Sequence, residues 1–167
     1  MADLGIGEDA VFLQPGEAIA TEAPIRIKTV VGSCLAIVVR APRIGVTVVA
    51  HCLLPRAGAA VGSIPRDEAI RYVDTAIEVM LSDLAARGAL PGDLEVKLFG
   101  GADAMECQGE PAYRVGRRNI DAARAALASR GLTASAHSVG GKRGRVLEVD
   151  AASGVVFVKR LPDQEGS

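Results

Sequence analysis

The chain has 167 residues, of which 49% are hydrophobic and 23% charged, as in a folded globular domain with one hydrophobic core. Its formal net charge of −1 gives no electrostatic signal of a surface for nucleic acid or an anionic membrane, and we expect neither partner. Without a secretory signal or an apolar run of bilayer length, the sequence predicts a cytoplasmic protein with no membrane insertion. We expect a single domain over residues 1–167, in which residues 162–167 form a short flexible tail.

Hydrophobic periodicity predicts seven strands and two helices. In chain order, the predicted elements are strands 25–31, 35–39 and 46–51, a helix from 65 to a stop at 88, a strand at 94–99, a helix from 117 or 119 to 130, and strands 132–137, 145–149 and 155–160. Strands outnumber helices, and several adjoin through tight turns, which predicts an α+β domain with a largely antiparallel sheet and helices outside. A doubly wound parallel sheet fits less well, because two helices are too few for its crossovers.

Cysteines and histidines are few. The three cysteines, Cys34, Cys52 and Cys107, show no Cys-x-x-Cys spacing, and the two histidines are His51 and His137. This set predicts reduced thiols, no metal site and no cofactor.

Cys34 and His51 flank a predicted β-hairpin whose loop is residues 41–44. If the two strands pair antiparallel around that loop, paired residue numbers sum to 85, and Cys34 lies directly opposite His51 on one sheet face. The thiol and the imidazole are then expected to form a hydrogen bond. A one-residue slip would put the two side chains on opposite faces, so the prediction depends on the register.

A paired thiol and imidazole form the arrangement of an activated cysteine nucleophile. An imidazole that takes the Cys34 proton creates a thiolate and later returns the proton to a leaving amine. Backbone N–H groups around Cys34 are candidate oxyanion donors, since Gly32 and Ser33 allow a close approach to the sheet edge. Thr29 is the candidate for orienting the other ring nitrogen of His51.

Each of these residues also has a purely structural interpretation. A cysteine at the start of an apolar strand is commonly a small buried hydrophobe, and a histidine at a strand end suits a boundary position. Thr29 could serve only as a strand-forming residue. Cys52 points to the other sheet face from His51 and is predicted to be core, whereas Cys107 falls in a predicted loop without a partner.

Two glycine pairs and a basic cluster follow predicted strands. Gly100-Gly101 and Gly140-Gly141 lack the spacing of a phosphate-binding loop, and we expect them to let the backbone pass close to a neighbour or an incoming peptide. The basic cluster at 142–145 suits a solvated hairpin edge, with contact to an acidic partner as the alternative. The candidates for substrate or oxyanion contacts are Gly32, Ser33, Phe99, Gly100 and Gly101.

Six short segments are each weak signals but form a specific pattern together. They are Thr29–Cys34 (TVVGSC), Ala50–Pro55 (AHCLLP), Lys97–Ala102 (KLFGGA) with Met105, Val115–Ile120 (VGRRNI), Val139–Arg145 (VGGKRGR), and Ser153-Gly154 leading to Val158–Leu161 (VKRL). On these segments, which run in order through nearly the whole length, the chain resembles the CheD family, the chemoreceptor glutamine deamidases of bacterial and archaeal chemotaxis.

The resemblance implies a protein-glutamine deamidase with a β-sandwich core flanked by helices, similar to bacterial deamidating toxins. The family cysteine corresponds to Cys34, its histidine to His51, and the threonine of the proposed triad to Thr29. The implied reaction is a thioester between Cys34 and a receptor glutamine, with release of ammonia and hydrolysis to glutamate. The implied partners are methyl-accepting chemotaxis receptors and a CheC-type phosphatase. The chain departs from the family pattern at Cys52 and Ser138, where an aromatic residue and an aspartate are expected.

Two other functions are compatible with the residues. One is a non-catalytic adaptor that binds receptors or a CheC-type phosphatase, and the other is an amidohydrolase for small molecules with a closed pocket. The pairing of Cys34 with His51 favours the enzyme, because an adaptor has no need of a paired thiol and imidazole. An activated Cys34 is expected to be alkylated at a pH below that of an ordinary cysteine.

Overall fold

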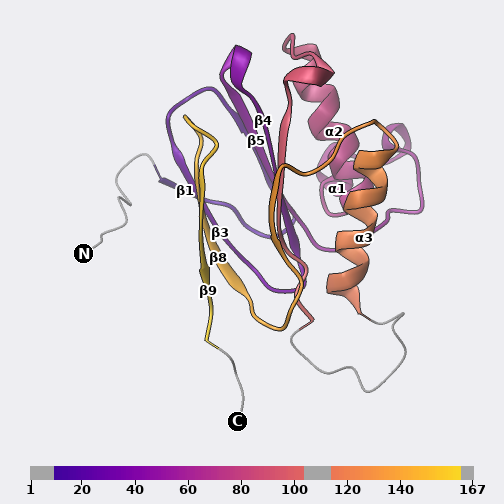
Figure 1. Ribbon diagram of the computed structural model, residues 1–167. Coiled ribbons are helices and arrows are strands. Elements are labelled where there is room, and N and C mark those ends of the chain that lie inside the picture. The colour runs from indigo at the N-terminus through magenta and orange to yellow at the C-terminus, as the bar shows by residue number, and fades with distance from the viewer. Residues whose placement is uncertain (1–9, 104–113, 163–167) are drawn as a thin grey trace.

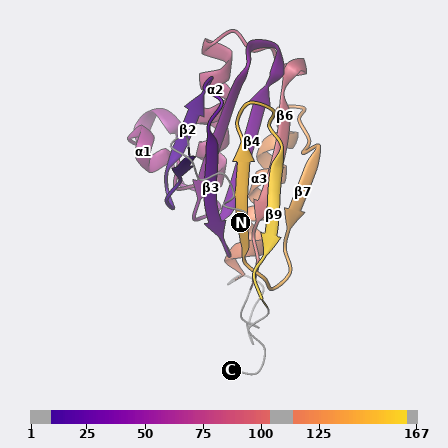
Figure 2. The ribbon, with the colours of Figure 1, turned by 90° about the vertical axis from the view of Figure 1, so that its left-hand side faces the viewer.

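Two β-sheets and a layer of helices make up the part of the chain that the computed structural model describes, residues 10–103 and 114–162. The sheets stack face to face, and the helices cover the outer face of one of them (Figure 1). The outer face of the other sheet is turned toward the viewer in Figure 2, and no helix of the described ranges lies over it. This arrangement confirms the predicted α+β fold with a β-sandwich core flanked by helices. Of the predicted tail, residues 163–167 lie outside the described residues.

The strands pair mainly antiparallel, with one parallel pair in each sheet. The four-stranded sheet contains, in spatial order, β1 (Ala10–Phe12), β3 (Arg26–Val31), β8 (Arg145–Asp150) and β9 (Val156–Arg160). The five-stranded sheet contains, in spatial order, β2 (Ala18–Thr21), β5 (Val46–Cys52), β4 (Leu35–Ala41), β6 (Glu95–Gly100) and β7 (Ala136–Val139).

Most predicted strands are observed with bounds that differ by one or two residues. The strand predicted at 132–137 is the exception, because β7 begins only at Ala136. The sequence does not predict β1 and β2, which have 3 and 4 residues and are too short to show a period-2 pattern.

The helices of the described ranges are α1 (Arg66–Ala69), α2 (Val73–Ala86) and α3 (Val115–Ala128). The prediction of one helix from 65 to 88 is wrong, because the chain leaves the helix between Ala69 and Val73. There, Tyr72 forms a β-bridge with Leu54, and the Val73 N–H donates to the Leu54 carbonyl at 2.8 Å. Pairing with the segment after β5 therefore replaces one turn of helix. None of these helices, within the described residues, is long and apolar enough to cross a membrane.

Strands β4 and β5 form the centre of the molecule and are buried on both faces. Side chains on one face, such as Leu35 and Ile37, pack in the cluster beneath α2 and α3. Side chains on the other face, such as Ala36 and Val38, pack between the two sheets. Burial on both faces explains why these strands read as continuous apolar runs rather than as alternating patterns.

The β4–β5 hairpin forms as predicted, but its register differs by two residues. Ala41 remains in β4 and pairs with Val46, so His51 lies opposite Ala36 rather than opposite Cys34. The cause is the turn, in which a short 3₁₀ helix at Pro42–Ile44 ends in Gly45 with φ of 67°. A shift of two residues preserves the side-chain faces, so Cys34 and His51 stay on the same side of the sheet.

Candidate active site

A buried hydrogen bond joins Thr29 and His51 across the two sheets. Thr29 comes from β3 in one sheet and His51 from β5 in the other, and both side chains point into the space between the sheets. Their Oγ1 and Nδ1 atoms are 2.7 Å apart. Because the residues are only 0% and 1% exposed, water does not compete for this contact. Thr29 therefore occupies the position predicted for a residue that orients the imidazole.

The Thr29 hydroxyl determines which nitrogen of His51 bears the proton. The hydroxyl donates its one hydrogen to the carbonyl of Leu13, at 2.8 Å. Its oxygen must then accept from Nδ1–H of His51, which leaves a lone pair on Nε2 of the neutral ring. Nε2 is buried and has no hydrogen-bond partner among the described residues. An oriented imidazole with a free basic nitrogen is the arrangement that a general base requires.

Cys34 lies in the loop between β3 and β4, immediately before the first residue of β4. Its side chain is half-buried and packs against the apolar cluster between the sheets, on the side where His51 lies. The backbone of the loop is fixed by the chain that follows β6. Gly101 N–H donates to the Cys34 carbonyl and Ala102 N–H donates to the Gly32 carbonyl, both at 2.9 Å. The Gly101 N–H thus holds the loop and is not free to bind an oxyanion.

No hydrogen bond joins the Cys34 thiol to His51 in the described residues, so the predicted hydrogen bond is absent. Burial raises the pKa of the Cys34 thiol, although a hydrogen bond with its own backbone acts in the opposite direction. Burial also lowers the pKa of His51. Both shifts favour the neutral forms of the thiol and the imidazole in the free protein, and the expected alkylation of Cys34 at low pH stays a prediction.

Gly100 is the glycine that the loop of residues 32–34, the Cys34 loop, requires. Its φ is +107°, and a Cβ at this position would lie 2.3 Å from the Cys34 carbonyl oxygen. Only glycine permits both the conformation and the approach. Gly32 was expected to provide room beside Cys34, but a Cβ there would meet nothing within 4 Å. The neighbouring Phe99 is 4% exposed and packs in the cluster between the sheets.

Asn119 is a buried residue of α3 that holds the site together. Its Nδ2 donates to the Ser33 carbonyl at 2.9 Å and to the Leu53 carbonyl at 3.2 Å. These carbonyls lie immediately before Cys34 and two residues after His51, so one amide links the two halves of the site. The motif VGRRNI contains Asn119, yet nothing in the sequence assigns it this role. The one available signal is an amide on the otherwise apolar inward face of the helix.

Cys52 has no place in the site. Cys52 is fully buried in the cluster beneath the helices, as predicted, and burial strongly raises the pKa of its thiol. Cys107 lies outside the described residues. Within the described ranges, no group of His, Cys, Asp and Glu side chains could hold a metal ion.

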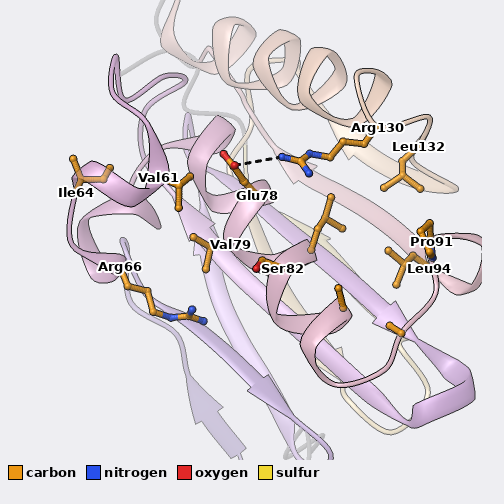
Figure 3. Close-up of a pocket in the computed structure, with 13 residues that line it drawn as sticks. Val61, Ile64, Arg66, Glu78, Val79, Ser82, Pro91, Leu94, Arg130 and Leu132 are labelled. Carbon is orange, nitrogen blue, oxygen red and sulfur yellow. Dashed lines mark ion pairs between the residues drawn. The ribbon is translucent and has the colours of Figure 1, made fainter.

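A cavity of about 570 Å³ lies on the helical side of the molecule (Figure 3). Its walls come from α2 and from the loops around Val61, Pro91 and Leu132, and an ion pair between Glu78 and Arg130 lies beside it. None of the three candidate catalytic residues lines this cavity. It is therefore separate from the candidate active site.

A family model described as "CheD chemotactic sensory transduction" matches residues 53–160. The chain belongs to the CheD family. It is 41% identical over 153 residues to a protein of Geobacter sulfurreducens named "Probable chemoreceptor glutamine deamidase CheD 2", covering 90% of this chain and 89% of the relative. It is 32% identical over 158 residues to "Chemoreceptor glutamine deamidase CheD" of Thermotoga maritima, covering 95% and 90%. CheD relatives thus match nearly the whole chain.

The similarity to solved structures is more distant. The crystal structure of YlmD from Geobacillus stearothermophilus superposes with a TM-score of 0.46 and 14% identity, covering 75% of this chain and 51% of that chain. At this level the likeness has no bearing on function.

Proposed function

We propose that this protein deamidates glutamine side chains of methyl-accepting chemotaxis receptors, producing glutamate and ammonia. Its CheD relatives in Geobacter and Thermotoga are named as chemoreceptor glutamine deamidases. The observation that most supports a Cys34 nucleophile is the buried Nε2 of His51, which has no hydrogen-bond partner in the part of the chain that the structure describes. Thr29 keeps the proton on the other ring nitrogen, so Nε2 is available as a base. The reaction would take place in the cytoplasm, and a CheC-type phosphatase is a proposed second partner.

The first half of the proposed reaction forms a thioester. Cys34 Sγ attacks the amide carbon as the thiol proton passes to Nε2 of His51, and the carbonyl electrons move to oxygen. His51 then returns the proton to the amide nitrogen, the C–N bond breaks, and ammonia leaves. Substrate binding must bring Sγ and Nε2 within hydrogen-bond reach, as is common where the free enzyme has a looser geometry.

The second half hydrolyses the thioester. Water attacks the acyl carbon and gives a proton to Nε2, which passes it to the departing sulfur as the C–S bond breaks. The Cys34 thiol is regenerated, and the receptor leaves with a glutamate side chain in place of the glutamine. Both halves pass through an oxyanion. The N–H group of Ser33 has no backbone acceptor among the described residues, so we propose it as a donor that stabilises the oxyanion.

The direct test is incubation of the wild-type protein with the cytoplasmic fragment of a receptor. We expect release of ammonia and a gain of about 1 Da at each modified glutamine, the mass change of amide hydrolysis. Mass spectrometry of peptides locates the sites. If receptor fragments bind but neither ammonia nor the mass change is found, the protein is an adaptor and the proposed enzyme is wrong.

A further inference from the structure

Arg145 is buried at the first residue of β8, although a solvated hairpin edge was expected there. The residue is only 2% exposed. The guanidinium donates to Ser138 Oγ at 3.0 Å, to the Gly140 carbonyl at 2.8 Å and to the Arg143 carbonyl at 3.2 Å. All of these acceptors are neutral. Within the described ranges, Arg145 forms no ion pair with a carboxylate. A buried cation held only by neutral acceptors is costly, since they replace its water without balancing its charge.

Further positive charge surrounds this guanidinium. Arg160 of β9 lies directly opposite Arg145 in the strand register, an arrangement that destabilises a sheet when charges are alike. Burial and the charge of Arg160 both lower the pKa of Arg145. Arg143 and Arg160 are exposed, and neither forms an ion pair with a described residue. The described structure therefore has a local excess of positive charge that an anion would offset.

These arginines line a small cavity next to the Cys34 loop. Its volume of about 190 Å³ is below the range of about 300–1,000 Å³ that is typical of small-molecule sites, but it is sufficient for a side-chain carboxylate. Gly140 N–H donates to the Gly100 carbonyl at 2.9 Å, and Gly100 is the residue packed against the Cys34 carbonyl. The cavity is lined by Val139, Gly140, Gly141, Lys142, Arg143, Arg145 and Arg160.

We infer that this basic cavity binds the carboxylate of an acidic side chain near the target glutamine of the protein substrate. The inference rests on the proposed function and adds a determinant of specificity to it. A polypeptide that presents a glutamine to Cys34 extends beyond the Cys34 loop. The cavity is adjacent to this loop, because Gly140 lines the cavity and bonds to Gly100, which packs against the Cys34 carbonyl. Charge complementarity then favours glutamines with acidic neighbours over those without.

The test measures binding separately from chemistry. In a Cys34→Ala background, which prevents turnover, affinity for a receptor cytoplasmic fragment is measured by fluorescence anisotropy at several salt concentrations. Arg143→Gln and Arg160→Gln should each weaken binding about two- to fivefold at low salt and reduce its salt dependence. The matched control is Arg43→Gln, which removes an arginine at the far end of β4, where it pairs with Asp93. Equal affinities for all three variants and the parent would overturn the inference.

Ser138 allows the charge to be cancelled without removing an arginine. Ser138→Asp places a carboxylate beside the Arg145 guanidinium, whereas Ser138→Asn adds similar bulk without charge. The aspartate variant should bind the fragment roughly tenfold more weakly than the asparagine variant, as expected for competition by a charge-assisted contact. Equal affinities of the two variants would contradict the inference.

The fragment supplies the complementary test. Replacing its acidic residues near the target glutamine by alanine should weaken binding to the parent and abolish the difference between the parent and Arg143→Gln. The inference is wrong if that difference persists. It is also wrong if the arginine substitutions weaken binding of inorganic phosphate but leave the affinity for the fragment unchanged, because the cavity then holds another anion. Ammonia release by the wild-type protein decides the proposed function independently of these affinities.

Discussion

The Thr29 hydroxyl is linked to both the Leu13 carbonyl and the His51 imidazole, so its removal affects the tautomer directly. In Thr29→Val the ring is no longer held with its proton on Nδ1, and Nε2 presents a lone pair only part of the time. We expect kcat for deamidation to fall by roughly 10²-fold, the lower end of what a positioned general base supplies. Initial rates of ammonia release measure the effect.

Thr29→Ser is the matched control for this variant, because it keeps the hydroxyl and loses only a methyl group. It should retain most of the activity. Thr29→Val also leaves two buried polar groups without partners, at a cost of about 1–3 kcal/mol each, so thermal unfolding must show that the variant is folded at the assay temperature. A folded Thr29→Val protein with wild-type kcat would remove Thr29 from the proposed triad.

The pKa of His51 predicts the acid limb of the activity profile. Burial lowers this pKa from its ordinary value of 6.5, and the proposed base must be neutral to accept the thiol proton. As the pH falls, activity should persist through 6.5 and decline only below it. The measurement is kcat/KM for deamidation as a function of pH. A midpoint above 6.5 would mean that the base is stabilised in its charged form, contrary to the burial observed.

The sequence identifies Cys34, His51 and Thr29 as candidates, but only the structure shows that Thr29 contacts His51. The two residues belong to different sheets, and no pattern along one strand shows which residue it meets across the core. The structural roles of Asn119 and Arg145 could not be predicted for the same reason. Each is a polar residue whose role depends on carbonyl groups from distant segments.

Among the connections between elements, the contact between Gly100 and the Cys34 loop gives the most specific prediction. Gly100→Ala forces a Cβ against the Cys34 carbonyl oxygen, so the loop and its thiol must move. A displacement of about 1 Å near reacting groups can cost roughly 10²-fold in rate. We therefore expect a loss of that order in kcat/KM for deamidation.

Gly131→Ala separates this effect from backbone strain. Gly131 also has a positive φ, +70°, but a Cβ there would meet nothing within 4 Å. Both substitutions should lower stability by about 1–2 kcal/mol through the left-handed conformation, and only Gly100→Ala should lose activity. Equal activity losses in the two variants would show that the close approach at Gly100 has no catalytic consequence.

In the β4–β5 hairpin, the predicted strands and their pairing are correct, whereas the predicted register is wrong. The strands and their pairing follow from two apolar runs around a proline-containing loop, and both are observed. The register depends on whether Ala41 continues the strand or enters the turn, and the composition of the loop does not decide this. Because the resulting error is two residues, the predicted face of His51 is correct while its predicted partner is not.

For the whole molecule, the site depends on the packing of one sheet against the other. Thr29 comes from the four-stranded sheet, whereas His51 and the strand that follows Cys34 belong to the five-stranded sheet (Figure 1). The apolar cluster between the sheets sets the separation of these groups. Asn119 then ties the helical layer to the same loop, so all three layers contribute to the position of Cys34.

The most direct test of the account compares chemistry and binding in Cys34→Ala. If Cys34 is the nucleophile, its removal abolishes the thioester, and losses of several orders of magnitude are typical when such a group is deleted. Binding of a receptor fragment uses a broad surface and should change little when one sulfur is lost. We predict that Cys34→Ala captures receptor fragments as wild type does, while mass spectrometry detects no conversion of the target glutamines to glutamate. Deamidation by Cys34→Ala at the wild-type rate would contradict the account.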